Sequence, residues 1–153
     1  MIRLRSNRLE FRGFEVYYEV REAENSNKTL VFLHGWTSSL QSWKFQLDDF
    51  GEYRVIALDF PGNGKSGRDE SADYSMELFA DAVHAALVEE GIDRALLFGH
   101  SMGFAVAEIF AIKYADLCAG IGSIDGTHFE LPDDLNEREA WIEANRGFVA
   151  SLE

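Results

Sequence analysis

The chain has one cysteine, two prolines and no long hydrophobic run. Cys118 alone cannot form an internal disulfide, and its apolar neighbours favour a small core residue over a catalytic thiol. No apolar segment reaches the roughly 20 residues of a membrane span. The basic residues near the N-terminus precede no hydrophobic core of a secretory signal. We therefore expect a cytoplasmic protein with no membrane partner.

Basic residues are also scarce. The sequence has 14 lysines and arginines against 27 aspartates and glutamates, which gives a net charge of −13. A nucleic-acid partner requires a basic face, and anionic membrane surfaces attract polybasic segments. The composition excludes both, and the acidity is interpreted as favouring solubility.

Hydrophobic periodicity predicts strands and helices that alternate after an N-terminal hairpin. The hairpin occupies residues 1–23 and turns at Arg12-Gly13. Three continuous apolar runs predict buried parallel strands, and a fourth segment reads as one more strand. These strands are expected at residues 29–33, 54–58, 95–98 and 120–124.

Helices are predicted between these strands. A short helix is expected over 42–50, and a longer one begins after the N-cap Ser75 and ends before Gly91. The segment after Ser101 is apolar nearly all round, which predicts a deeply buried helix. Residues 133–153 have a charged amphipathic pattern. The sequence thus predicts an α/β fold with a mostly parallel sheet covered on both faces, and ligands bind such sheets at the carboxyl ends of the strands.

One motif, Gly99-His100-Ser101-Met102-Gly103, lies between an apolar strand and an apolar helix. That context is typical of the nucleophile elbow of a serine hydrolase. Ser101 would occupy the tip of a strained turn, and glycines would flank it because the two backbones crowd together. The N-terminus of the helix would stabilise an oxyanion formed there. The alternative is a chance match between a core strand and a core helix.

Two further motifs follow the earlier buried strands: His34-Gly35-Trp36 and the segment Asp59–Ser66. Their order and spacing resemble the α/β-hydrolase superfamily, which shows an HG motif, a D-x-x-G-x-G-x-S loop and then G-x-S-x-G. Asn63 stands where that family often carries histidine. The glycine loop lacks the spacing of a phosphate-binding loop and is interpreted as a shaping loop.

The resemblance implies that Ser101 is the nucleophile. It places the oxyanion hole at the backbone N–H groups of Trp36 and Met102, and Gly35 lets the chain turn so that an amide can face the elbow. The Trp36 indole would form part of the pocket wall. Such a wall favours a small apolar or aromatic ester-like substrate. Neither a cofactor nor a metal is expected.

The catalytic acid and base are harder to place. The family order is serine, then carboxylate, then histidine, and His128 is the only histidine after Ser101. The family base comes far downstream, so the resemblance implies that acid and base lie beyond the end of the sequence. Asp125 is an alternative acid and reads equally well as a turn residue. His34 is expected to support its loop, and His100 is expected to point away from the serine.

These inferences combine into one hypothesis with two alternatives. Residues 1–130 are expected to form the N-terminal part of an α/β-hydrolase core whose sheet is truncated after the sixth strand. Residues 131–153 are expected to begin a helical cap that is incomplete. The complete enzyme would hydrolyse carboxylic ester-like substrates through an acyl-enzyme, and this chain alone would be inactive. A serine at the elbow disfavours the epoxide hydrolase and dehalogenase branches, whereas thioester, lactone, carbon–carbon and peroxy-acid chemistry stay open. The alternatives are a non-catalytic ligand-binding member of the fold and a split subunit that needs a partner. The sequence leaves the oligomeric state open.

Overall fold

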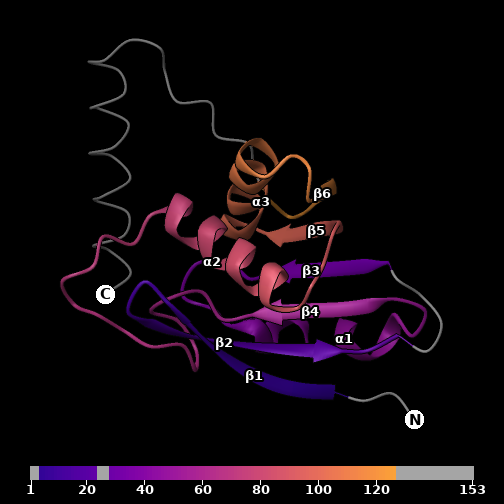
Figure 1. The fold of residues 1–153 in the computed structure, drawn as a ribbon, viewed down its shortest axis with the longest axis horizontal. Coiled ribbons are helices and arrows are strands. Elements are labelled where there is room, and N and C mark those ends of the chain that lie inside the picture. Colours follow the sequence, from indigo (N-terminus) through magenta and orange to yellow (C-terminus); the bar gives the residue numbers. More distant parts are fainter. Residues whose placement is uncertain (1–3, 24–27, 127–153) are drawn as a thin grey trace.

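The computed structural model describes residues 4–23 and 28–126, which form a six-stranded sheet with helices on both faces (Figure 1). The strand order is β1-β2-β4-β3-β5-β6. The elements in chain order are β1 (Leu4–Phe11), β2 (Phe14–Arg21), β3 (Thr29–Leu33), the 3-10 helix η1 (Leu40–Trp43), α1 (Gln46–Asp49), β4 (Arg54–Leu58), α2 (Met76–Glu89), β5 (Ala95–His100), α3 (Met102–Lys113) and β6 (Cys118–Ile124). The predicted α/β class and the mostly parallel sheet are confirmed.

The N-terminal hairpin is confirmed with its turn at the predicted position. Strands β1 and β2 pair antiparallel, and the turn residues Arg12 and Gly13 have φ values of 47° and 84°. Two-residue hairpin turns of this kind require positive φ at both positions. Strand β2 lies between β1 and β4, so its polar residues Glu19 and Arg21 are buried, whereas Glu15 near its start is exposed. The Tyr17 hydroxyl accordingly donates to the Glu19 carboxylate at 2.7 Å.

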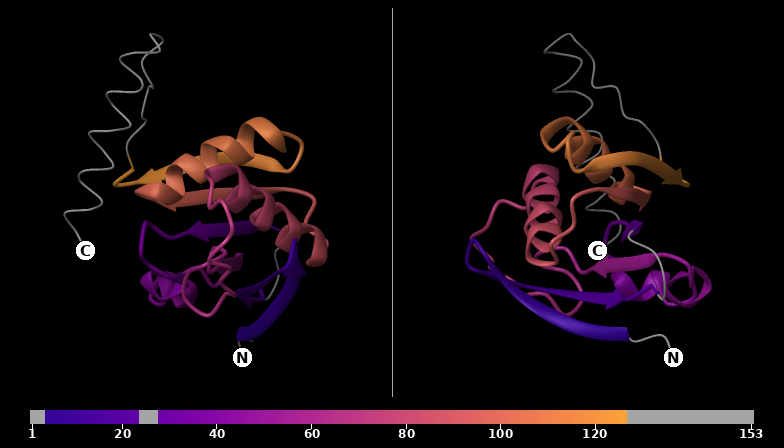
Figure 2. Two further views of the ribbon diagram at one scale, coloured as in Figure 1. Left: turned by 90° about the vertical axis from the view of Figure 1, so that its left-hand side faces the viewer. Right: turned by 45° about the vertical axis from the view of Figure 1, so that its right-hand side comes forward.

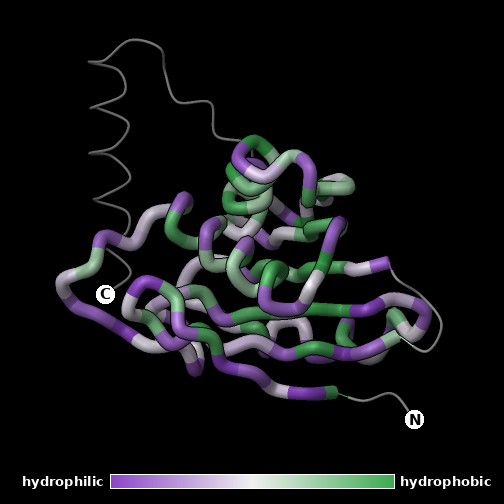
Figure 3. The backbone as a smooth tube through the Cα atoms, in the orientation of Figure 1, coloured by the Kyte–Doolittle hydropathy of each residue, from purple (hydrophilic) through white to green (hydrophobic). Residues whose placement is uncertain are grey.

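Strands β4, β3, β5 and β6 lie side by side in this order, and each adjacent pair among these four is parallel. The central strands β3 and β4 are mostly apolar because both of their faces are covered, whereas Ile121 and Ile124 of the edge strand β6 are each 39% exposed. On one face α2 and α3 lie side by side, as Figure 2 shows, and Val83 and Phe110 pack against Val31 and Leu97. On the other face η1 and α1 cover a second apolar cluster. Figure 3 shows the hydrophobic residues along the central strands between these layers.

The helix α2 begins and ends where its capping residues predict. The Ser75 hydroxyl accepts the Leu78 N–H at 3.1 Å, and Gly91 follows the helix with a φ of 63°. The prediction of a single helix over 42–50 is wrong, because the structure has the 3-10 helix η1 and the one-turn helix α1 in this region. The physical reason is a distant carboxylate: Asp59 accepts the Leu40 N–H at 2.7 Å and fixes an earlier start.

The predicted deep burial of α3 is wrong for part of the helix. Val106 and Phe110 are fully buried, whereas the Ile112 side chain is 81% exposed. Helix α3 packs on α2, β5 and β6 and touches β3, whereas the side that carries Ile112 is open to solvent within the described residues. Cys118, predicted as a core residue, is half-buried at the start of β6.

The amphipathic segment expected over 133–153, with the proposed cap, lies outside the described residues, and so does His128. Among the residues that are described, no helix combines the length and the apolar character needed to cross a membrane.

Candidate active site

The turn between β5 and α3 holds Ser101 in a strained conformation. Its φ is 51° and its ψ is −119°, a region that residues with a side chain rarely occupy. The residue is exposed, and its hydroxyl makes no hydrogen bond to any described part of the chain. The fold therefore presents this hydroxyl to solvent at the carboxyl edge of the sheet.

The glycines on either side of Ser101 are required by backbone contact. A Cβ on Gly99 would lie 2.3 Å from the carbonyl oxygen of Gly103. A Cβ on Gly103 would lie 2.3 Å from the Leu33 oxygen and 2.7 Å from the His34 oxygen. The first turn of α3 thus rests directly on the ends of β3 and β5, which is the crowding that the motif predicts.

The segment after β3 turns beside this elbow. Gly35 lies under the His100 ring, because a Cβ there would be 2.9 Å from Nδ1 of His100. The N–H of Trp36 has no hydrogen-bond acceptor within residues 4–23 and 28–126. Met102 is the first residue of α3, so its N–H has no acceptor inside the helix. These are the two donors that the resemblance assigns to an oxyanion hole, and that role stays a prediction.

His34 joins the ends of β3 and β4. Its ring is fully buried, with Nδ1 at 2.8 Å from the Gly35 oxygen, and Nε2 accepts the Phe60 N–H at 3.1 Å. Burial lowers the pKa of His34, and an accepting Nε2 places the proton of the neutral ring on Nδ1. Because both ring nitrogens are engaged, the geometry describes a structural tie between two strands.

The loop after β4 is shaped by its own carboxylate. Asp59 is buried, and it accepts the Leu40 N–H at 2.7 Å and the Lys65 N–H at 2.8 Å. Ser66 closes the loop, because its hydroxyl donates to the Asp59 carbonyl at 2.7 Å and accepts the Tyr17 N–H at 2.8 Å. These bonds support the interpretation as a shaping loop. Sequence reasoning missed the roles of Asp59 and Ser66, although their positions at the two ends of the motif were the available signal.

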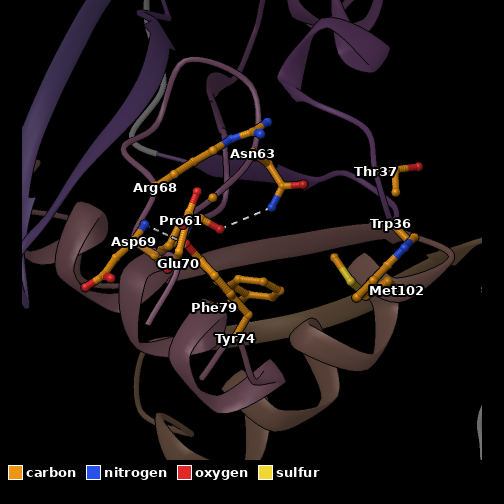
Figure 4. A pocket seen from close by; sticks show the side chains of 11 residues that line it. Trp36, Thr37, Pro61, Asn63, Arg68, Asp69, Glu70, Tyr74, Phe79 and Met102 are labelled. Carbon is orange, nitrogen blue, oxygen red and sulfur yellow. Dashed lines mark hydrogen bonds between the residues drawn. The ribbon is translucent and has the colours of Figure 1, made fainter. Parts of the chain in front are cut away.

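A pocket of about 370 Å³ opens beside the elbow (Figure 4). Its volume lies within the range of small-molecule sites. Its wall is formed by Trp36, Thr37, Pro61, Gly62, Asn63, Arg68, Asp69, Glu70, Tyr74, Phe79 and Met102. The structure therefore brings Trp36 and Met102, both predicted from the sequence, into one wall. The remaining lining residues come mostly from the loop between β4 and α2, and its second part, from Arg68 to Tyr74, was not singled out in the sequence.

Asp125 lies at the same edge of the sheet as Ser101. Strands β5 and β6 pair His100 with Ile124, and the next residue of each strand is therefore at the carboxyl end. Asp125 is exposed with a φ of 52°, and the following residue, Gly126, donates its N–H to the Ser123 hydroxyl at 3.1 Å. This conformation is that of a turn, and the acid role of Asp125 stays a prediction.

No described histidine hydrogen-bonds Ser101. His34 is engaged on both ring nitrogens, and His84 in α2 stacks on Tyr114 with ring centroids 3.9 Å apart. His100 lies against the backbone after β3. Among the described residues there is also no cluster of three histidine, cysteine, aspartate or glutamate side chains that could hold a metal ion.

Comparison with known proteins agrees with this geometry at the level of the family. The model of the alpha/beta hydrolase fold matches residues 28–152. The chain belongs to this family, and the predicted resemblance is confirmed.

Individual relatives differ in the chemistry that their names state. Epoxide hydrolase 3 of Xenopus tropicalis is 28% identical over 123 residues, which cover 79% of this chain and 33% of that protein. Epoxide hydrolase B of Mycobacterium tuberculosis is 37% identical over 99 residues, which cover 62% of this chain and 28% of that protein. The solved structure of Est816, described as an N-acyl homoserine lactone degrading enzyme, has a TM-score of 0.73 and is 28% identical in sequence. The matched region covers 78% of this chain and 45% of the Est816 chain. The chain thus spans a third or less of the length of these two curated relatives.

Proposed function

We propose that the protein is a serine hydrolase that cleaves carboxylic ester-like substrates through an acyl-enzyme on Ser101. The observation that carries the proposal is the strained, exposed turn at this residue, with φ at 51°, beside a pocket of about 370 Å³. The Ser101 oxygen attacks the ester carbonyl carbon, the C–O bond to the alcohol breaks, and water then releases the acid. The N–H groups of Trp36 and Met102 stabilise the oxyanion, each by about 3 kcal/mol.

The reaction also needs a group that accepts the Ser101 proton and returns it to the leaving alcohol. None of the three described histidines is hydrogen-bonded to this serine. The proposal therefore assigns the base to a histidine later in the chain than Asp125, as the family order implies.

Epoxide opening is a second candidate, because relatives of this chain are named epoxide hydrolases. The elbow residue argues against it. A serine oxygen that opens an epoxide forms an ether, and an ether has no carbonyl for water to attack. A carboxylate nucleophile would form an ester that water can cleave. Ser101 at the elbow therefore supports ester substrates, among which a lactone is a cyclic case.

The proposal is tested by labelling the complete gene product with a fluorophosphonate probe and mapping the modified residue. We expect modification at Ser101 and none in Ser101→Ala, whereas the control Ser38→Ala in the turn after β3 is labelled normally. Nitrophenyl acetate and styrene oxide then separate the two chemistries. Labelling at another residue, or diol formation that survives Ser101→Ala, would overturn the proposal.

A further inference from the structure

The pocket wall contains one positively charged side chain, Arg68, beside the carboxylates of Asp69 and Glu70. It lies on the loop between β4 and α2, and it is exposed. Its guanidinium has no hydrogen-bond or ion-pair partner within the part of the chain that the structure describes. Figure 4 shows this side chain extended along the rim, with its guanidinium in the direction of Asn63.

The residue next to Arg68 is held firmly in place. The Tyr74 hydroxyl accepts the Asp69 N–H at 2.9 Å and donates to the Asp69 carbonyl at 3.0 Å. The Asp69 carboxylate accepts the Ser71 N–H at 2.9 Å and the Ser71 hydroxyl at 2.6 Å, and these bonds lower the pKa of Asp69. This acid is therefore occupied within its own turn, and the adjacent guanidinium keeps its donors available.

Much of the rest of the pocket wall is apolar, with Trp36, Pro61, Phe79 and Met102 contributing to it. A free guanidinium beside such a wall suits a ligand that has an apolar body and an anionic end, because the planar fork of donors matches a carboxylate. The protein as a whole carries a net charge of −13, which repels anions at long range. An anionic ligand would therefore depend on a local cation in this pocket.

We propose that Arg68 selects substrates whose apolar acyl or aromatic body ends in a carboxylate, such as monoesters of dicarboxylic acids. This inference rests on the proposed function, since it takes the pocket beside Ser101 to be the substrate pocket. Arg68 acts here in specificity, and the bond-breaking step is assigned to other groups.

The inference is tested by calorimetric titration of the complete gene product with 4-phenylbutyrate and with 4-phenylbutyramide, which have the same size and differ in charge. We expect the carboxylate to bind about tenfold more tightly, a difference of about 1.4 kcal/mol. Arg68→Gln should remove this preference and leave the affinity for the amide unchanged, whereas Arg68→Lys should keep part of it. The preference should also shrink at high salt, because the guanidinium is exposed.

Lys44→Gln is the matched control, because Lys44 is an exposed cation outside the pocket that lies over the Phe45 ring. It removes the same charge and should leave the preference intact. The indole N–H signal of Trp36, assigned with Trp36→Phe, should shift with either ligand and place it in the pocket. Equal affinities in the wild-type protein, or a preference that survives Arg68→Gln, would overturn the inference. Binding is measured without turnover, so this result stands or fails separately from the labelling of Ser101.

Discussion

Gly103→Ala is the substitution that most directly tests the link between backbone packing and reactivity. The new Cβ would lie 2.3 Å from the Leu33 oxygen and 2.7 Å from the His34 oxygen, and both are backbone atoms that cannot rotate away. An ordinary carbon–oxygen contact is about 3.4 Å, so the first turn of α3 must move by about 1 Å. Overpacking of this kind costs about 1–3 kcal/mol of unfolding free energy. The N–H of Met102 moves with the helix.

The expected loss of reactivity is comparable in free energy to the loss of stability, because a hundredfold change in rate corresponds to about 2.7 kcal/mol. A displacement of about 1 Å at a catalytic group can lower the rate by about a hundredfold. We expect Gly103→Ala in the complete gene product to fold, to unfold at lower urea concentration, and to react with a fluorophosphonate about a hundredfold more slowly at Ser101.

Gly91→Ala provides the control for destabilisation alone. A Cβ on Gly91 meets no atom within 4 Å, but its φ of 63° strains an alanine, at a cost of about 1 kcal/mol. This variant should lose stability and keep the wild-type labelling rate. If folded Gly103→Ala also labels at the wild-type rate, the contact between α3 and β3 does not position the site, and the reasoning is refuted.

Three further predictions concern the segments around the elbow. Trp36→Pro removes one proposed oxyanion donor and should lower kcat/KM for nitrophenyl acetate by about a hundredfold or more, whereas Trp36→Phe should mainly change substrate preference; near-normal activity of a folded proline variant would contradict the assignment. Asp59→Asn places an amide donor against the buried N–H of Leu40 or of Lys65 and should cost about 1–3 kcal/mol in urea unfolding, so an unchanged midpoint would argue against the shaping role. Burial lowers the pKa of His34, so below about pH 6.5 the unfolded state binds a proton that the folded state does not, and stability should fall as the pH is lowered through that value. The loss between pH 8 and pH 5.5, measured by urea unfolding, should be smaller in His34→Gln, and an equal loss in both proteins would exclude this origin.

The parts of the fold that the sequence predicted well are those fixed by local chemistry. Strands β3 and β4 have the predicted bounds because burial of both faces favours a continuous apolar run after the first residue of each strand. Helix α2 follows from its capping residues Ser75 and Gly91. The prediction of one helix over 42–50 was wrong because the carboxylate of Asp59, which is distant in the sequence, accepts the Leu40 N–H and determines where the first helical turn begins.

The candidate site shows the same division. The elbow is recognisable because its glycines, its serine and its flanking apolar runs are adjacent in the sequence. Arg68 and Tyr74 reach the pocket only because the loop after β4 folds back over it, and a polar loop carries no periodicity from which that course could be predicted. The base is a different case, since placing it depends on residues beyond Asp125.

The order of the strands has a consequence for folding during synthesis. Strand β3 lies between β4 and β5, yet β5 leaves the ribosome well after the other two. Until then one edge of β3 has unpaired backbone groups, which can pair with another nascent chain. The turn at Ser101 can adopt its strained geometry only when β5 has paired with this edge of β3 and the first turn of α3 has packed against the carbonyl oxygen of Leu33. Non-local parallel pairing is slow, so we expect the reactive turn to form late, after the rest of the central sheet has assembled.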